Sequence, residues 1–374
     1  MATNNNNKAL NVPHLRFPEF TEEWETKPIN DLAVVIGGGT PDTTVKSYWD
    51  GEIQWFTPSE IGKTKYVDSS LRTITEDGLN NSSAKRLPPN TILLSSRATI
   101  GECSLSLREC ATNQGFQSLV SKKCNVDFLY YLIQTKKNDL IRKSCGSTFL
   151  EISANEVRKI QVSIPSDVEQ QKIAGLLSLI DERIATQNKI IDKLQSLIKG
   201  ITQNITLHNK PNVRISECLE CTSSTLQESD ALRSGTYPVY GANGIVGYLD
   251  NYSTQDEAVY IIKDGSGVGT VSYVTGQCST TGTLNTLQAK EGYSLQYLYY
   301  ILKVFNFEPY KTGMAIPHIY FKDYGKAKIF CPSYTKQLQY ARLLSAIDGK
   351  VSTEQNSLAS LSLQKQYLLR QMFI

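Results

Sequence analysis

The chain has 374 residues, of which 40% are hydrophobic and 20% charged, and its formal net charge is +3. This length predicts more than one hydrophobic core, and the mild positive charge neither requires nor excludes a nucleic-acid partner. No run approaches the roughly 18 apolar residues of a membrane span, and residues 1–10 lack a signal-peptide pattern. We therefore expect a cytoplasmic protein without membrane contact, in which the eight scattered cysteines are reduced thiols.

The first part of the chain predicts a β-rich domain preceded by an arm. Residues 12–31 mix prolines with Phe17, Phe20 and Trp24, a composition that predicts an extended arm with its aromatic side chains anchored on a core. Between residues 32 and 120, short β-branched or aromatic runs alternate with turn clusters. Such alternation is typical of a series of strands.

Two helices are predicted next. The first covers residues 126–142, which are apolar on one side and basic on the other. After a loop and a strand, a much longer helix begins near Pro165, with Ser166 as the expected N-cap and Glu169 at the spacing of a capping box. Apolar residues then recur alternately four and three positions apart, which indicates a coiled coil. This seam contains Ile173, Leu177, Ile180, Ile184, Gln187, Ile191, Leu194, Ile198, Ile201 and Ile205.

The same helical pattern returns at the end of the chain. Residues 332–351 align without a gap on residues 165–184 when the numbering is shifted by 167, the difference between 332 and 165. Gln170 and Gln337 form one of the identical pairs, whereas the globular segments repeat with few identities. Lys365 lies on the second seam, so we expect looser packing near the C-terminus. The second seam contains Tyr340, Leu344, Ile347, Val351, Glu354, Leu358, Leu361, Lys365, Leu368 and Met372.

These patterns predict a mixed α/β fold in which two pseudo-repeated α/β domains are separated by two long antiparallel coiled-coil helices. The alternative is that two unrelated amphipathic helices lie in separate cores. The expected boundaries are 1–165 for the first domain with its arm, 166–206 for the central helix, 207–332 for the second domain and 333–374 for the C-terminal helix.

The chain lacks the motifs of an enzyme that acts on nucleotides. An amino-methyltransferase needs an Asp/Asn-Pro-Pro-aromatic motif to grip a flipped base, whereas the sole Pro-Pro pair here lies in LPPN at residues 87–90. Gly265, Gly267 and Gly269 imitate a nucleotide-binding loop, but they lead into another β-rich run rather than a helix. We therefore predict a tight turn between two strands at this position.

Metal-dependent chemistry finds no support in the sequence either. We find no convincing case of the nuclease pattern, in which an acid is followed by an acid-x-Lys triplet on a strand, and no ATP-binding P-loop; the three histidines have no short spacing. Cys218-x-x-Cys221 has the spacing of half a zinc site, but Cys278 and His318 do not supply a second close pair. We expect no metal and no catalytic residue in this chain.

Five stretches carry a family resemblance. They are LRFPEFTEEW at residues 15–24, IGGGTPDT at 36–43, IQWFTPSEI at 53–61, PSDVEQQKIAGLLSLIDERI at 165–184 and PSYTKQLQYARLLSAID at 332–348. With them, nearly the whole chain resembles the specificity subunit of a Type I restriction-modification system. The helical motifs are the more specific ones.

The resemblance implies two target-recognition domains, each of which reads one half of a bipartite site on double-stranded DNA. It implies that the helices set the distance between the halves and dock two methyltransferase subunits, to which endonuclease/translocase subunits add. A helix over residues 173–205 would span about 50 Å, or about 14 base pairs of DNA. Seam residues expected to act as spacer and docking positions are Ile173, Leu177, Ile180, Ile184, Ile191, Leu194, Leu344, Ile347, Val351, Leu358 and Leu361, and apolar positions expected to meet partner helices are Leu176, Leu197, Leu343 and Leu363.

By the same resemblance, this chain is a non-catalytic subunit. S-adenosylmethionine, ATP and Mg²⁺ are expected on the partner subunits, and the assembled complex is expected to have adenine-N6 methyltransferase and ATP-dependent endonuclease activity. Two other functions stay open. A self-contained methyltransferase would bind S-adenosylmethionine by itself, whereas a coiled-coil adaptor with protein-binding domains would not retain DNA.

Candidate DNA contacts follow from side-chain chemistry. Lys and Arg supply phosphate contacts, whereas Asn, Gln, Ser, Thr and Arg on loops reach base edges. For each such residue, a solvated charge or a turn residue bonded to its own backbone is an equal alternative. The candidates are Arg97, Thr99, Asn113, Gln114, Lys136, Ser147 and Thr148 in the first domain and Asn243, Lys263, Ser266, Thr280, Thr281, Lys311 and His318 in the second.

Overall fold

The computed structural model describes residues 10–146, 150–313 and 316–374. The chain forms two compact units, the first made of residues 1–187 and 357–374 and the second of residues 188–356. Two long helices, α6 (Asp167–Leu207) and α10 (Tyr334–Gln371), contribute residues to both units. Both helices were predicted from the heptad pattern, and both predictions are confirmed.

The first unit is built on a five-stranded sheet with the order β2-β9-β6-β7-β4. The unit also contains a separate three-stranded sheet with the order β5-β3-β8, and a two-stranded sheet in which β1 pairs with β10. The elements are β1 (Glu25–Pro28), α1 (Ile29–Leu32), β2 (Ala33–Gly37), η1 (Lys46–Tyr48), β3 (Trp49–Phe56), η2 (Pro58–Glu60), β4 (Tyr66–Val67), β5 (Arg72–Ile74), α2 (Glu76–Asn80), β6 (Ile92–Leu94), β7 (Cys103–Ser106), β8 (Cys110–Thr112), β9 (Gln117–Ser121), α3 (Val126–Thr135), α4 (Lys137–Arg142), α5 (Ala154–Lys159) and β10 (Gln161–Ile164).

The second unit repeats this plan with a four-stranded sheet, β12-β18-β15-β16, and a smaller sheet, β14-β13-β17. Here β11 and β19 form the pair that corresponds to β1 and β10. The elements are β11 (Val213–Arg214), α7 (Ile215–Cys218), β12 (Leu219–Ser223), η3 (Glu228–Asp230), β13 (Tyr237–Gly241), β14 (Gly244–Leu249), β15 (Glu257–Ile262), β16 (Val271–Thr275), β17 (Ser279–Thr280), β18 (Leu284–Ala289), α8 (Leu295–Lys303), η4 (Glu308–Tyr310), α9 (Phe321–Tyr324) and β19 (Lys328–Ile329).

The two units share their strand pairings as well as their element order. In the strand order of each main sheet, the first two strands are an antiparallel pair, which is β2 with β9 in the first unit and β12 with β18 in the second. The less common parallel pairing also recurs, between β3 and β8 and between β13 and β17. The prediction of a duplicated, mixed α/β fold is therefore confirmed.

The predicted arm anchors its aromatic residues on the core of the first unit. The Trp24 ring is buried and packs edge-on against Phe128 of α3 and Phe373, at centroid distances of 6.1 and 6.4 Å. Arg16 donates two hydrogen bonds of 2.8 Å to the buried carboxylate of Glu169, which raises the pKa of the guanidinium. Glu169 was expected to complete a capping box with Ser166; its carboxylate instead holds the arm against the start of α6.

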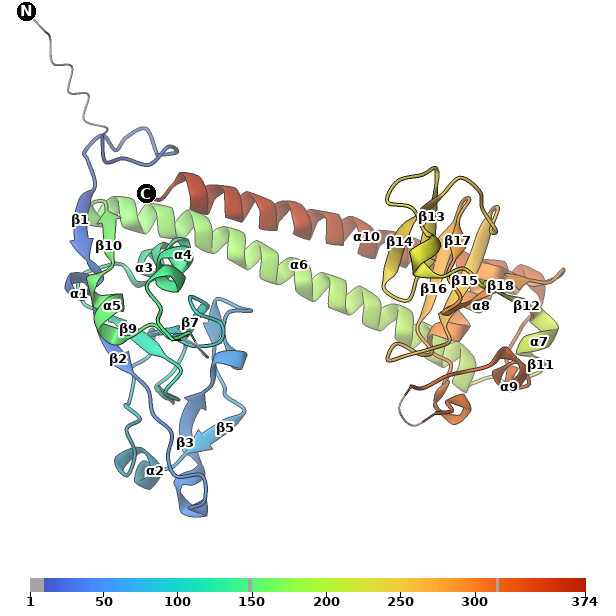
Figure 1. Ribbon diagram of the computed structural model, residues 1–374, viewed down its shortest axis with the longest axis horizontal. Helices are drawn as coiled ribbons and strands as arrows, with labels where there is room; N and C mark the ends of the chain where they lie inside the picture. The colour runs from blue at the N-terminus through green and yellow to red at the C-terminus, as the bar shows by residue number, and fades with distance from the viewer. Residues whose placement is uncertain (1–9, 147–149, 314–315) are drawn as a thin grey trace, which may run out of the picture. The chain divides into compact units, whose positions relative to one another are not determined.

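The predicted seam positions of both long helices are all buried or half-buried. In the first unit, Ile173 and Leu177 of α6 share a core with Leu368 of α10 and with Met372, which directly follows this helix. The beginning of α6 thus meets the end of α10, and the two helices run in opposite directions there (Figure 1). In the second unit, the buried seam positions include Ile191, Ile198, Ile205, Leu344 and Val351.

Lys365 does not loosen the C-terminal packing, contrary to the expectation. Its ammonium group lies 2.7 Å from the carboxylate of Asp181, and both side chains are mostly buried. Leu368 and Met372 beyond it are buried as well. A charged seam residue is accommodated because the facing helix supplies its counter-charge.

Two smaller predictions have different outcomes. The single helix expected over residues 126–142 is divided into α3 and α4, because Lys136 adopts φ −93° and ψ 10° between them. The glycine-rich segment after β15 is a turn between antiparallel strands, as predicted, with positive φ at Gly265 and Gly269.

Candidate functional site

Each unit is fixed to its long helix by a glutamine near the helix start. The Gln170 side chain donates to the Pro165 carbonyl at 3.0 Å and accepts from the backbone N–H of Asn125, the N-cap of α3, at 3.0 Å. In the second unit, Gln337 donates to the Pro332 carbonyl at 2.9 Å and accepts from the N-cap of α8, Ser294, at 2.9 Å. Both glutamines are buried, so each joins two backbone groups that water does not reach.

A tyrosine makes a second matching contact in each unit. Tyr131 of α3 donates to the Asp181 carboxylate at 2.7 Å, and Tyr300 of α8 donates to the Asp348 carboxylate at 3.2 Å. Asp181 and Asp348 are another pair related by the shift of 167, here 348 minus 181. The identical residues of the two long helices thus include those that hold the α/β parts in place.

The turn after β6 carries two predicted DNA contacts of the first unit. Arg97 is half-exposed and forms an ion pair with Glu151 at 2.9 Å. Thr99 is exposed and donates to the Ser95 hydroxyl at 3.1 Å. With Lys137 and Leu150, these residues line a groove of about 1030 Å³.

The loop between β8 and β9 carries the next two candidates. The Asn113 side chain accepts from the backbone N–H of Gly115 at 2.8 Å, so it stabilises its own turn. Gln114 is exposed and accepts a hydrogen bond from Thr40. Asn113 thus acts within its loop, while Gln114 is open to solvent. Ser147 and Thr148 lie outside the described residues.

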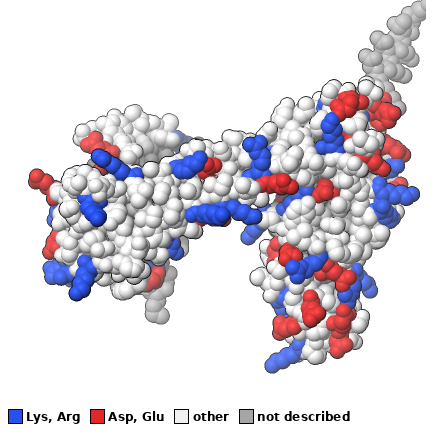
Figure 2. All heavy atoms as spheres, turned by 180° about the vertical axis from the view of Figure 1, so that it is seen from behind, with Lys and Arg blue, Asp and Glu red and all other residues white. Residues whose placement is uncertain are grey.

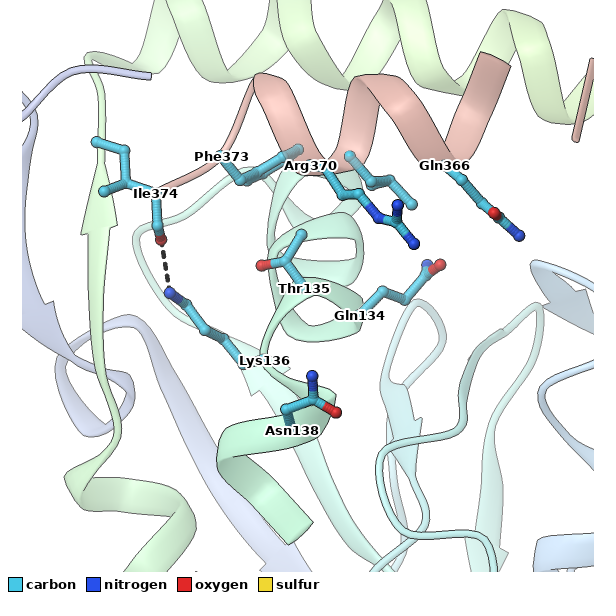
Figure 3. A pocket seen from close by; sticks show the side chains of 9 residues that line it. Gln134, Thr135, Lys136, Asn138, Gln366, Arg370, Phe373 and Ile374 are labelled. Carbon is cyan, nitrogen blue, oxygen red and sulfur yellow. Dashed lines mark hydrogen bonds between the residues drawn. The ribbon is translucent and has the colours of Figure 1, made fainter. Parts of the chain in front are cut away.

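Lys136 lies apart from the other candidates of the first unit. It lines a pocket of about 390 Å³ between the α3–α4 junction and the end of α10, together with Gln134, Asn138 and Arg370 (Figure 3). Its ammonium group donates to the carbonyl oxygen of Ile374 at 2.6 Å. Partial burial lowers the pKa of the Lys136 side chain.

In the second unit, the structure brings three candidates together. Lys263 and Ser266 lie on the turn between β15 and β16, and the backbone N–H of Ile319 donates to the Lys263 carbonyl at 2.9 Å. His318, the residue before Ile319, is hydrogen-bonded through Nδ1 to the Asp264 carboxylate at 2.7 Å. This turn and this loop correspond to the turn and loop that hold Arg97 and Glu151 in the first unit.

The other candidates of the second unit are more scattered. Asn243 is exposed in the hairpin turn between β13 and β14, and Lys311 pairs with Glu308 at 2.6 Å. Thr280 and Thr281 are buried, with their hydroxyl groups 3.2 and 2.8 Å from those of Thr286 and Thr283. In this conformation the two buried threonines support the sheet edge and do not face solvent.

Sequence reasoning missed the acidic partners, Glu151 and Asp264. A signal for them was present, because Arg97 and Asp264 differ in number by 167, as do Glu151 and His318. The basic and acidic residues exchange positions between the units, so a search for identical residues at this shift does not find them.

Charge is dispersed over the face that Figure 2 draws. On this face, Lys and Arg side chains are interspersed with Asp and Glu side chains and with uncharged residues. Any electrostatic attraction for a polyanion on this face is therefore local to particular turns and loops.

The outer faces of the long helices keep several apolar side chains in solvent. Leu197, Leu343 and Leu363 are 49%, 50% and 67% exposed, in agreement with the prediction that these apolar positions lie on the surface. Leu179 is a further exposed position, at 60%. Leu176 differs, because it packs against the core of the first unit.

Within the described part of the chain, no helix is long and apolar enough to cross a membrane. No group of three acidic, His or Cys side chains that could hold a metal occurs among the described residues.

The fold and these contacts define a duplicated protein in which two similarly built α/β units present different turns and loops. A family model described as "Type I restriction modification DNA specificity domain" matches residues 21–196 and again residues 210–363. The chain therefore belongs to the family of Type I restriction-modification DNA specificity proteins, and the resemblance found in the sequence is confirmed.

Two relatives illustrate the range of similarity. The chain is 39% identical to the Type I restriction enzyme MjaIX specificity subunit of Methanocaldococcus jannaschii over 184 residues, which cover 47% of this chain and 43% of the relative. This match thus spans less than half of that protein. The Type I restriction enzyme EcoprrI specificity subunit of Escherichia coli is 25% identical over 384 residues, with 93% of this chain and 92% of the relative covered.

A solved structure has the same fold along the chain. The crystal structure of a Type I restriction-modification system S subunit from M. genitalium superposes with a TM-score of 0.64 at 18% identity, and it covers 97% of this chain and 99% of that chain.

Proposed function

We propose that this chain is the non-catalytic specificity subunit of a Type I restriction-modification complex, and that each unit reads one half of a bipartite site on double-stranded DNA. The observation that carries the proposal is the repeated anchoring of two units with different loops. Gln170 and Gln337 make the same pair of buried hydrogen bonds, and Tyr131 and Tyr300 contact equivalent aspartates. Repeated anchors fit a shared geometry, while different loops fit two different half-sites.

Within each unit, the exposed candidates are assigned to DNA contact. Thr99 and Gln114 in the first unit, and Asn243 and Ser266 in the second, are exposed on turns. Hydroxyl and amide groups at such positions suit base edges, while Lys263 and Lys311 suit phosphates. The buried Thr280 and Thr281 are assigned a supporting role.

The long helices are assigned the roles of spacer and docking surface. Leu179, Leu197, Leu343 and Leu363 are exposed apolar side chains on helices, a feature that fits contact with the helices of two methyltransferase subunits. In this assignment S-adenosylmethionine, ATP and Mg²⁺ belong to the methyltransferase and endonuclease subunits. Adenine-N6 methylation and ATP-dependent cleavage are then activities of the whole complex.

The test is to map methylated adenines across the genome of cells that produce this chain together with its partner methyltransferase. We expect one bipartite motif with a gap of constant length, and no methylation in cells that lack the chain. A motif that stays the same without the chain, or a single uninterrupted motif, would contradict the proposal.

A companion measurement separates the remaining functions. Calorimetric titration of the purified chain with S-adenosylmethionine should give no binding heat, whereas a self-contained methyltransferase would bind it. A protein-binding adaptor would fail to retain DNA of any sequence at physiological salt, even with the methyltransferase subunits present.

A further inference from the structure

One loop in each unit closes in the same way. In the first unit, the backbone N–H groups of Cys145 and Glu151 donate to each other's carbonyl oxygens at 2.9 and 3.0 Å. In the second unit, Thr312 and His318 do so at 2.9 and 2.7 Å. The closing residues differ in number by 167, so the loops are counterparts.

The last residue of each loop also pairs with the turn that follows an interior strand of the main sheet. Glu151 forms a β-bridge with Arg97 after β6, and His318 forms one with Asp264 after β15. Each of these residues is therefore hydrogen-bonded to the start of its own loop, and its neighbour is bonded to the turn, through Ile152 N–H to Ser96 and Ile319 N–H to Lys263. The position of the loop ends at Glu151 and His318 depends on this junction.

Left-handed backbone marks the same positions in both units. The residue after Arg97 or Asp264 has a φ of 54° at Ala98 and 94° at Gly265, and the first residue inside each loop has a φ of 134° at Gly146 and 87° at Gly313. Alanine is strained in this region, and strained backbone persists where surrounding contacts fix it. Positive φ thus recurs at these positions even where the residue, Ala98, does not favour it.

A basic and an acidic side chain bridge the turn and the loop in both units, but with exchanged positions. Arg97 Nη2 lies 2.9 Å from Glu151 Oε2, so the cation is on the turn in the first unit. His318 Nδ1 lies 2.7 Å from Asp264 Oδ1, so the acid is on the turn in the second. We name these two pairs the loop clasps.

The loop clasps contribute little to folding. Their side chains are 36% to 43% exposed, and ion pairs in such positions add at most about 1 kcal/mol to stability. Instead, the clasps restrict the positions of the loop ends, Glu151 and His318, relative to the turns that carry Arg97 and Asp264. Each loop also displays an exposed aliphatic side chain, Leu150 at 50% and Ile316 at 58%, a type of group that can contact the methyl group of thymine.

We propose that the loop clasps are positioning devices for DNA reading, so that Arg97 and His318 act by fixing the loop ends beside Leu150 and Ile316 rather than by reading a base. The inference rests on the proposed function of the chain. It reassigns two residues that side-chain chemistry alone suggests as direct contacts. It also explains why the pair is present in both units with its basic and acidic members exchanged, because a clasp needs a donor facing an acceptor and not a particular order.

The experiment uses the full chain with its partner methyltransferase and reads the methylated motif. Glu151→Lys places two cations side by side and should lower discrimination at positions of one half-site by about tenfold, the size of one lost base contact, while the other half stays unchanged. His318→Glu places two carboxylates together and should relax the other half-site instead.

Charge exchange distinguishes a clasp from a direct contact. The double variants Arg97→Glu/Glu151→Arg and Asp264→Arg/His318→Glu restore opposite charges in the reversed order and should restore the motif. A residue that reads a base would not be rescued in this way. Asp68→Lys serves as the matched control, because it breaks an exposed ion pair of the first unit, with Arg108 at 2.7 Å, outside the clasp.

The outcomes distinguish a failure of the proposed function from a failure of the clasp. If the wild-type chain directs no bipartite motif, the proposed function fails, and the inference falls with it. If the wild-type motif is present, then an unchanged motif in Glu151→Lys and His318→Glu, a loss in both halves at once, or a double variant that folds but is not rescued overturns the clasp alone. Thermal unfolding midpoints verify folding.

Discussion

Glu169 is a buried carboxylate that connects the N-terminal arm to α6. It accepts two hydrogen bonds from Arg16, which is 13% exposed, and one from the Trp24 indole at 3.4 Å. Glu169→Ala should destabilise the first unit by about 3 kcal/mol, because it leaves the guanidinium without a partner. Tryptophan fluorescence during urea unfolding measures this, since Trp24, Trp49 and Trp55 all belong to the first unit.

The exposed ion pair of Glu19 with Lys172 provides the control for that prediction. Both side chains are nearly half-exposed, so Glu19→Ala should change the free energy of unfolding by less than about 0.5 kcal/mol. Equal changes in the free energy of unfolding for Glu169→Ala and Glu19→Ala would show that the buried pair of Arg16 and Glu169 does not stabilise the attachment of the arm.

Ala98 provides a residue-scale test of backbone strain. Its φ of 54° lies in the left-handed region, where a side chain costs about 1–2 kcal/mol and glycine costs little beyond its flexibility. Ala98→Gly should therefore stabilise the first unit by roughly 0.5–1 kcal/mol in the same fluorescence assay. Ala185→Gly, at an exposed position inside α6, should destabilise by about 1 kcal/mol. The same sign for both substitutions would contradict the strain argument.

At the scale of elements, the junction between each unit and its long helix depends on a buried glutamine. Gln170→Ala and Gln337→Ala each remove one hydrogen bond to a proline carbonyl and one to an N-cap amide. We expect each to cost about 2 kcal/mol and to increase amide hydrogen exchange at the start of α3 or α8, respectively.

The neighbouring Gln171 is exposed, so Gln171→Ala should leave exchange unchanged. The prediction is wrong if Gln170→Ala affects α8, or if Gln337→Ala affects α3, as strongly as its own unit. Matching effects within the two units would establish that Gln170 and Gln337 stabilise the junction with the long helix in the same way.

The pair of Asp181 and Lys365 joins α6 to α10 in the first unit. Because the side chains are only 15% and 19% exposed, a double-mutant cycle with alanine at each position should give a coupling energy of about 1 kcal/mol. The exposed pair of Asp139 and Arg142 within α4 should give no more than about 0.5 kcal/mol. A coupling at Asp181 and Lys365 no larger than in this control would mean that the seam charge does not help to fix the helix pairing.

The long helices could be predicted in detail because their signal is periodic and local. All seam positions from Ile173 to Ile205 and from Tyr340 to Met372 are buried or half-buried. Lys365 was misjudged, because its partner Asp181 is 184 residues away (365 minus 181) and no local pattern relates the two. The break at Lys136 depends on backbone angles that an unbroken amphipathic pattern does not reveal.

The candidate site was predictable only in part. Side-chain type identifies residues able to contact DNA, but it does not tell an exposed Ser266 from a buried Thr280 or from Asn113, which is occupied by its own turn. Glu151 and Asp264 were missed because a clasp is a relation between two loops. Such relations appear once the strand order places a turn beside a distant segment.

At the scale of the whole molecule, the spacer role of the helices predicts a defined change in the recognised DNA. One added heptad in α6, with one in α10 to preserve the pairing of seam positions, lengthens each helix by about 10 Å. At 3.4 Å per base pair, the gap of the bipartite motif should grow by about three base pairs while both half-sites stay the same. Methylation mapping measures both features at once.

A loop insertion controls for added length without added helix. Seven Gly and Ser residues placed between β12 and β13, in the largely exposed segment 224–236, should leave the gap unchanged. If the heptad insertions also leave the gap unchanged while the proteins remain folded and active, the helices do not set the spacing. If the half-sites change together with the gap, reading and spacing are not separate properties of the chain, and the assignment of reading to the units and of distance to the helices would be wrong.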